Sequence, residues 1–145
     1  MGCGGERRSA VEEKREELVR VLNEVLSAEY GALWLLPRHM AEVQDEELRR
    51  QLHLIAEVEL EHAEMSLAMI HQLGGRATAD LPQLTARSDL REVLEAHVEG
   101  ERQSIAIYER AMGLADDPEL RKALAQMKAE EEGHLRLLER ALERL

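Results

Sequence analysis

The sequence predicts an all-α protein in which four long helices form one four-helix bundle. In four segments, apolar residues recur every three or four positions, which is the period of an amphipathic helix. Aromatic residues make up only 2% of the 145 residues and Phe is absent, so the core must consist of Leu, Val, Ile, Ala and Met. This composition favours helices over strands, and the chain length fits one domain with a substantial core.

The first predicted helix spans about residues 9–42. Ser9, followed by Glu12 three positions later, is typical of a helix start. Pro37 removes a backbone donor, so we expect the helix either to kink near residues 33–36 or to end there. The apolar face of this helix carries Leu18, Val21, Leu22, Val25, Leu26, Ala32, Leu33 and Leu36.

The second predicted helix spans about residues 45–73, and the pair Gly74-Gly75 ends it. A connection over residues 75–88 follows, and it contains Pro82. The inner face of the second helix carries Leu48, Leu52, Ile55, Glu59, His62, Ser66, Met69 and Leu73.

The third predicted helix begins at Ser88 or Asp89 and ends near Leu114. The turn at residues 116–118 places a proline at the start of the fourth helix, which runs to Leu145. The inner face of the third helix carries Leu90, Leu94, His97, Glu101, Ile105, Tyr108 and Met112. The inner face of the fourth carries Leu120, Leu124, Met127, Glu131, His134, Leu138 and Leu142.

The lengths of the connections predict the topology. Short breaks join the first helix to the second and the third to the fourth, so each pair forms an antiparallel hairpin. The longer 75–88 link can travel the length of the bundle as one long crossover; a flat helical array without a crossover is the alternative. Each half has a helix with one inward Glu followed by a helix with Glu-x-x-His, a weak repeat of about 70 residues.

The motif Glu-x-x-His occurs at Glu59/His62 and at Glu131/His134. On residue counts alone the motif is weak, because roughly one His in six here would have Glu three positions earlier by chance. The position of the motifs is more informative. Residues three apart lie on one helix face, and both motifs fall on apolar faces near the middle of their helices, so their side chains point into the core.

Glu29 and Glu101 occupy the corresponding places on the other two helices, each on an apolar face near mid-helix. Glutamate is almost never fully buried without a partner, and four inward carboxylates would repel or become protonated. Metal ions would offset these charges. The alternative is a bundle in which the polar residues are buried incidentally.

The ligand types indicate iron, with manganese as the other choice, because mixed carboxylate and imidazole ligation suits these metals and no thiolate is present in the pattern. Four Glu and two His can bind two ions. Glu59 and Glu131 are the candidates to bridge both ions, because each shares its helix face with a His. Glu29 and Glu101 would then be terminal ligands, and the complete set of metal and catalytic candidates is Glu29, Glu59, His62, Glu101, Glu131 and His134.

Two further residues lie one or two turns from Glu101. His97 could be an extra ligand, a proton donor behind the ligands, or a core His that a backbone carbonyl satisfies, and we favour the last interpretation. Tyr108 could hydrogen-bond a ligand carboxylate or could simply pack. Five other glutamates fall on outward or flanking positions and are interpreted as solvated surface: Glu61, Glu64, Glu99, Glu130 and Glu132.

The net charge of −11 argues against a nucleic-acid surface, which needs clustered Lys and Arg. The acidity either concentrates cations near a metal site or simply keeps the protein in solution. Cys3 is the single cysteine, no secretory signal is recognisable, and no run of residues reaches membrane-spanning length, so we expect a cytoplasmic protein. Residues 1–8 are expected to form a flexible tail with Cys3 as an unused thiol, and residues 9–145 the bundle domain.

The sequence resembles the ferritin-like superfamily, within it the bacterioferritin and rubrerythrin branch. Residues 22–29 with Ala32 look like the first helix of a bacterioferritin, residues 59–64 like its second, and residues 131–134 like its fourth. Gly100-Glu101 is similar to the third-helix site of rubrerythrins. The resemblance covers about residues 18–142.

The resemblance implies a ferritin-like bundle with two iron ions held by the six residues named above. It implies oxidation of ferrous iron by dioxygen or hydrogen peroxide, with a rubrerythrin-like peroxidase as the first alternative. A non-catalytic, metal-stabilised bundle and an iron-storage subunit are further alternatives.

Departures from the family pattern refine these expectations. Leu60 replaces the haem-binding Met of bacterioferritins, so no haem is expected. Leu36 stands where a Tyr is usual, and Ser104 where rubrerythrins have an extra Glu. A rubredoxin domain is absent, so a peroxidase would need an external electron donor. The chain ends with the fourth helix, which favours a homodimer over a storage cage, and neither nucleic acid nor membrane is expected as a partner.

Overall fold

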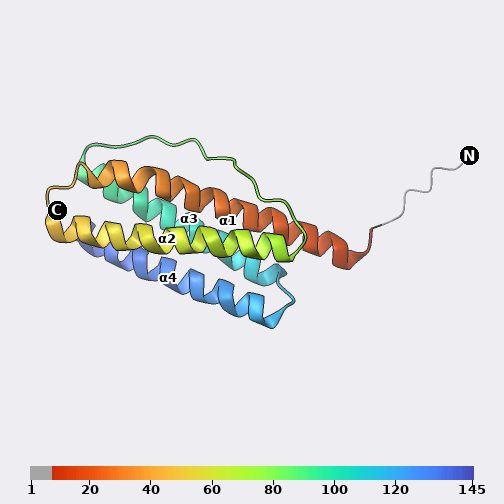
Figure 1. Cartoon of the computed structure of the whole chain (residues 1–145). Helices are drawn as coiled ribbons and strands as arrows, with labels where there is room; N and C mark the ends of the chain where they lie inside the picture. The colour runs from red at the N-terminus through yellow and green to blue at the C-terminus, as the bar shows by residue number, and fades with distance from the viewer. Residues whose placement is uncertain (1–7) are drawn as a thin grey trace, which may run out of the picture.

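The computed structural model describes residues 8–145, which form a bundle of four helices (Figure 1). The predicted all-α fold is confirmed, and no strand occurs within these residues. Residues 1–7, with Cys3 and most of the predicted tail, lie outside the described residues. The helices are α1 (Ala10–Met40), α2 (Glu46–Gln72), α3 (Leu90–Leu114) and α4 (Pro118–Glu143).

Every helix begins at a side-chain cap that accepts a hydrogen bond from a backbone N–H of the first turn. At α1, the Ser9 hydroxyl accepts from the N–H of Glu12, and the Glu12 carboxylate accepts from the N–H of Ser9. The other three caps are aspartates, which satisfy the same orphan donors and place a negative charge at the positive end of the helix. They are Asp45, Asp89 and Asp117.

Pro37 lies inside α1, which continues to Met40, so of the two outcomes expected at this proline, the end of the helix is wrong and the kink stays a prediction. Because Pro37 is only three residues from the end, it disturbs the hydrogen bonding of the last turns alone. The Arg38 guanidinium donates to the carbonyl of Trp34 at 2.6 Å and lies 3.7 Å from the centre of the Trp34 ring. Arg38 therefore supports the helix end next to the proline.

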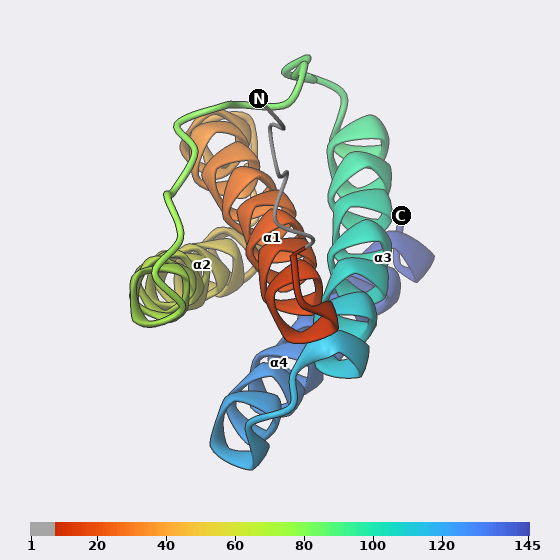
Figure 2. The ribbon, with the colours of Figure 1, turned by 90° about the vertical axis from the view of Figure 1, so that its right-hand side faces the viewer.

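The chain runs as two antiparallel hairpins, α1–α2 and α3–α4, joined by one long crossover over residues 73–89 (Figure 1). The crossover follows the length of the bundle, so the flat array is excluded. Figure 2 shows α1 between α2 and α3, with α4 against α3. The helices α2 and α4 touch over a short stretch only. Within residues 8–145, no helix has the length and apolar content that a bilayer crossing requires.

Polar side chains of α1 fix the crossover along the bundle. The Asn23 amide donates to the carbonyl of Arg76 at 2.9 Å and accepts from the N–H of Thr78 at 2.7 Å. One turn further, the Ser27 hydroxyl donates to the carbonyl of Asp80 at 2.7 Å. These bonds satisfy backbone groups of a segment without regular structure of its own, so the crossover has a defined position.

The apolar core consists of two clusters, one toward each end of the bundle, and the mid-helix glutamates lie between them. The first cluster unites Leu18, Val21, Leu22, Val25, Leu26, Ala63, Met69, Ile70, Tyr108, Ala111, Ala115, Leu120, Leu124 and Met127. The second unites Leu36, Val43, Leu48, Leu52, Ile55, Leu94, Val98 and Leu138. Burial of both clusters holds the four helices in register, which brings the middle of each helix to a common layer.

Candidate metal centre

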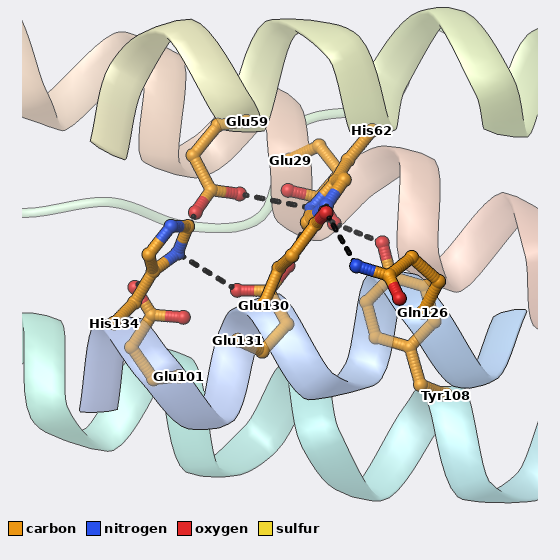
Figure 3. A network of polar contacts seen from close by, with 9 residues as sticks. All are labelled: Glu29, Glu59, His62, Glu101, Tyr108, Gln126, Glu130, Glu131 and His134. Atoms are coloured by element: carbon orange, nitrogen blue, oxygen red, sulfur yellow. Dashed lines mark hydrogen bonds and ion pairs between the residues drawn. The ribbon is translucent and has the colours of Figure 1, made fainter. Parts of the chain in front are cut away.

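The six predicted ligand side chains meet in the middle of the bundle (Figure 3). Every helix contributes: α1 and α3 one Glu each, α2 and α4 one Glu-x-x-His pair each. Their exposed fractions are low, with 12% of the His134 side chain the highest. The residues are Glu29, Glu59, His62, Glu101, Glu131 and His134.

The six residues form two overlapping groups, each able to surround one metal ion. Within a group, one nitrogen or oxygen from every member lies within 4.8 Å of the others. Glu59 and Glu131 belong to both groups, which is the arrangement that bridging carboxylates require. The first group adds Glu29 and His62, and the second adds Glu101 and His134.

The imidazoles face the carboxylates through their Nδ1 atoms. His62 Nδ1 lies 2.6 Å from Glu131 Oε1 and 3.8 Å from Glu29 Oε1. His134 Nδ1 lies 3.0 Å from Glu59 Oε1 and 3.4 Å from Glu131 Oε2. Each imidazole therefore presents one nitrogen to the same space as the carboxylates of its group.

Several of these atoms have no hydrogen bond, although they are close together. Among residues 8–145, no partner with hydrogen-bond geometry is found for Glu59 Oε1, either carboxylate oxygen of Glu131, or Nδ1 of His62 and His134. Leaving buried polar atoms unpaired costs about 1–3 kcal/mol each, and more for charged groups. Lone pairs that converge on a shared space without bonding one another fit metal ions, and the donor set suits iron or manganese.

Without metal, protons compensate the buried charges. Burial, together with Glu59 and Glu131, raises the pKa of Glu29 well above its usual value, and burial raises the pKa of Glu101 to about 12. Burial opposes the charged form of Glu131 as well, but His134 and His62 hold the pKa of that carboxyl below its usual range. Although burial disfavours its charge, Glu131 and Glu59 raise the pKa of His134 to about 9.

These pKa shifts predict that the metal-free protein loses stability as pH rises from 6 to 9. A folded-state pKa raised from 6.5 to about 9 means that His134 contributes stability fully below pH 6.5 and loses it through pH 9. Glu101 acts in the same direction, and the contribution of ionised Glu131 stays constant over this window. Thermal melting of chelator-treated protein is expected to show a decrease of roughly 5–10 °C.

The variant His134→Gln is the control for this pH dependence. It lacks the titrating imidazole, so its melting temperature is expected to change less between pH 6 and pH 9. A melting temperature of the metal-free protein that rises over the same range would contradict the assigned protonation states.

Tyr108 contacts the site directly. Its hydroxyl donates to Glu29 Oε1 at 2.6 Å, and its side chain is fully buried. Burial, with Glu29 next, raises the pKa of Tyr108, so the phenol keeps its proton and remains a donor. Of the two interpretations of Tyr108, hydrogen bonding to a candidate ligand is therefore present in addition to packing.

Glu130 is part of the site, so its interpretation as solvated surface was wrong. His62 Nε2 donates to Glu130 Oε2 at 2.6 Å, and the Gln126 amide donates to Glu130 Oε1 at 3.0 Å. This contact keeps the proton of neutral His62 on Nε2 and leaves Nδ1 free to bind metal. Glu130 is therefore a positioning residue.

Replacing Glu130 by Ala is expected to weaken metal binding by roughly 10–100-fold, because the bond that orients a ligand imidazole is lost. Equilibrium titration with Co2+, whose absorption reports carboxylate and imidazole ligation, measures the change. Glu132→Ala is the matched control, because Glu132 lies two residues away on α4 and contacts Lys128 at 3.3 Å. Equal affinities of the two variants would contradict the role of Glu130.

His97 does not join either ligand group. Its Nε2 lies 2.8 Å from Nδ1 of His39, and Nε2 of His39 accepts from the N–H of Arg87 at 2.9 Å. Because Nε2 of His39 is an acceptor, the proton of this imidazole lies on Nδ1, which donates it to Nε2 of His97. Burial lowers the pKa of His97 to about 4. His97 is thus a neutral core histidine, whose partner is an imidazole and not the expected backbone carbonyl.

The structure resembles solved structures of di-iron proteins over almost its whole length. A ferritin-like, di-iron-carboxylate protein from Bacillus anthracis has a TM-score of 0.85 and 29% identity, covering 93% of this chain and 99% of that chain. The bacterioferritin of Desulfovibrio desulfuricans, whose structure describes a di-iron site, has a TM-score of 0.85 and 22% identity, covering 94% and 84%. The bacterioferritin of Rhodobacter capsulatus has a TM-score of 0.81 and 23% identity, covering 88% and 84%.

The sequence comparisons agree with the fold. A search of curated protein sequences finds no match to the chain. The family model described as a ferritin-like domain matches residues 16–145, which include all four helices except the first turns of α1. The candidate carboxylate–histidine site thus lies in a fold shared with di-iron-carboxylate proteins, and the chain belongs to the ferritin-like domain family.

Proposed function

We propose that this protein binds two iron ions at the six mid-helix residues and oxidises ferrous iron with dioxygen or hydrogen peroxide. The observation that carries the proposal is the pair of overlapping, buried ligand groups that share Glu59 and Glu131. The di-iron sites named for the similar Bacillus and Desulfovibrio structures support the same assignment.

Charge balance favours two divalent ions. The four glutamates carry four negative charges when ionised, which two ferrous ions neutralise. Glu29 and Glu101, whose pKa values burial raises, and His134 give up their protons when metal binds. Metal binding therefore releases protons, and acidification is expected to weaken it.

The residues of the chain have distinct tasks in this proposal. Glu59 and Glu131 would hold both ions, Glu29 and His62 would complete the ligand set of one, and Glu101 and His134 would complete that of the other. When bound, two ferrous ions would supply the electrons that reduce the oxidant, one electron each. The two apolar clusters close the site toward both ends of the bundle, and Tyr108 and Glu130 hold Glu29 and His62 in place.

The experiment adds ferrous iron to metal-free protein and follows ferric absorption, with dioxygen in one series and hydrogen peroxide without air in the other. We expect iron oxidation faster than in buffer alone with at least one oxidant. Strong preference for peroxide, with turnover when an external reductant is added, would favour the rubrerythrin-like peroxidase. Bound iron that is oxidised no faster than free iron would contradict the proposed activity.

A further inference from the structure

A cavity of about 700 Å³ lies between α1, α3 and the crossover. Glu59 and Glu101, which are buried and both belong to the second ligand group, line its inner part. The exposed side chains of Glu24, Glu99 and Gln103 also line it. The cavity therefore connects the protein surface to two of the candidate metal ligands.

Small residues create this cavity. Along α1 its wall is formed by Ala28, Gly31 and Ala32, and along α3 by Gly100 and Ser104. Larger side chains at such positions would fill the space between packed helices, as they do in the two apolar clusters. The small residues that leave this space open therefore lie at the same level of the bundle as the candidate metal ligands.

The crossover forms the roof of the cavity and is firmly placed. Pro82 and Leu84 line the cavity, and a Cβ added at Gly31 would lie 3.1 Å from Pro82 Cγ. The bonds from α1 to Arg76, Thr78 and Asp80 anchor the segment before Pro82. The cavity is therefore open with the crossover in its observed position, and the crossover does not have to move to expose it.

The charges of the lining suit a cation. The lining residues include four glutamates, at positions 24, 59, 99 and 101, against one arginine, Arg87. Glu24 is paired with Arg110 at 2.6 Å, whereas Glu99 accepts from the neutral amide of Gln103. Glu59 Oε1, on a side chain only 2–3% exposed, has no hydrogen-bond partner among the described residues. An ion that enters thus meets carboxylates first at the surface and again at the site.

We propose that this cavity is the passage through which ferrous ions reach the centre, an inference that rests on the proposed function. Six waters of hydration occupy roughly 180 Å³, at about 30 Å³ each, which is less than the cavity volume of about 700 Å³, so the cavity has room for a hydrated ion next to Glu59 and Glu101. On the opposite side, Glu130 of α4 reaches His62 of α2, and the Gln126 amide donates to Glu130 (Figure 3). The cavity on the α1–α3 side is the open approach.

The test uses two exposed glycines of α3. Gly100 lines the cavity, Gly113 does not, and at either position an added Cβ meets no described atom within 4 Å. Gly100→Trp is expected to obstruct the passage, and Gly113→Trp is its matched control. Replacing Gly in a helix does not lower its intrinsic helix propensity, so both variants are expected to fold.

Rapid mixing of metal-free protein with Co2+ measures the rate of entry independently of redox chemistry, and equilibrium titration gives the number of ions bound. We expect Gly100→Trp to bind the normal number of ions about tenfold more slowly, equivalent to about 1.4 kcal/mol in the barrier, while Gly113→Trp keeps the original rate. Equal rates in the two variants, or fewer ions bound by Gly100→Trp at equilibrium, would overturn the inference that ions enter through this cavity. Absence of Co2+ binding in the unaltered protein would instead overturn the proposed function and the passage together.

A second pair of variants tests the charge at the mouth without adding bulk. Glu99→Gln is expected to slow Co2+ entry at low salt, with the difference fading at high salt because screening removes the attraction. Glu61→Gln, an exposed change on α2 away from the cavity, is expected to leave the rate unchanged. A larger effect of Glu61→Gln than of Glu99→Gln would place the entrance elsewhere and overturn the inference.

Discussion

Replacing Glu59 and Glu131 together by Ala is expected to abolish metal binding and the ferric absorption that follows addition of ferrous iron in air. These two residues belong to both ligand groups, so each ion would retain only one carboxylate and one imidazole from the protein. Two donors cannot replace the water that is stripped from a divalent ion in a buried site. Metal analysis after gel filtration and absorption spectroscopy measure the loss.

The matched control is Glu61→Ala combined with Glu132→Ala. Both residues lie within two positions of the altered ones, on the same helices, and neither belongs to a ligand group. This control pair removes the same charge and is expected to retain full metal binding. Undiminished binding in the Glu59→Ala, Glu131→Ala variant would remove the site assignment.

Metal binding is expected to raise the melting temperature of the protein by more than about 10 °C. A ligand that binds the folded state alone stabilises it by about 4 kcal/mol at a free concentration one thousand times its dissociation constant, and each kcal/mol is worth a few degrees in a domain of this size. The physical origin is the layer of four buried glutamates, whose charge the ions neutralise. Calorimetry of metal-free and Co2+-loaded protein measures the shift.

The Glu59→Ala, Glu131→Ala variant serves as the reference for that shift, because its melting temperature should not respond to Co2+. A comparable rise in this variant would mean that the ion stabilises the fold from another site. A melting temperature of the original protein that stays constant at saturating Co2+ would contradict the central layer as a metal centre.

The helices and the convergence of the six residues could be predicted from local patterns. The spacing of apolar residues along the sequence identifies the buried face of each helix, and Ser9 and Pro118 mark where two of the helices begin. Since Glu29 and Glu59 lie near the middle of their helices on buried faces, they reach a common layer whichever direction the helices run. Their common height therefore does not depend on the topology, and in the structure both residues belong to one ligand group.

The features that were missed depend on which helix faces which. Glu130 reaches His62 only because α2 and α4 approach each other at this height, and the sequence places Glu130 on a flanking position. His39 and His97 pair across 58 positions of sequence, where no local pattern links them. The cavity arises from Gly31 and Gly100 on separate helices, which are meaningful only once α1 and α3 are known to be neighbours.

The most direct test of the metal centre is anomalous diffraction from crystals of the protein grown with ferrous iron under exclusion of air. The proposed function predicts two anomalous peaks per chain. One peak should lie between Glu29, Glu59, His62 and Glu131, and the other between Glu59, Glu101, Glu131 and His134. Absence of anomalous density among these residues, or peaks confined to surface carboxylates, would contradict the proposal.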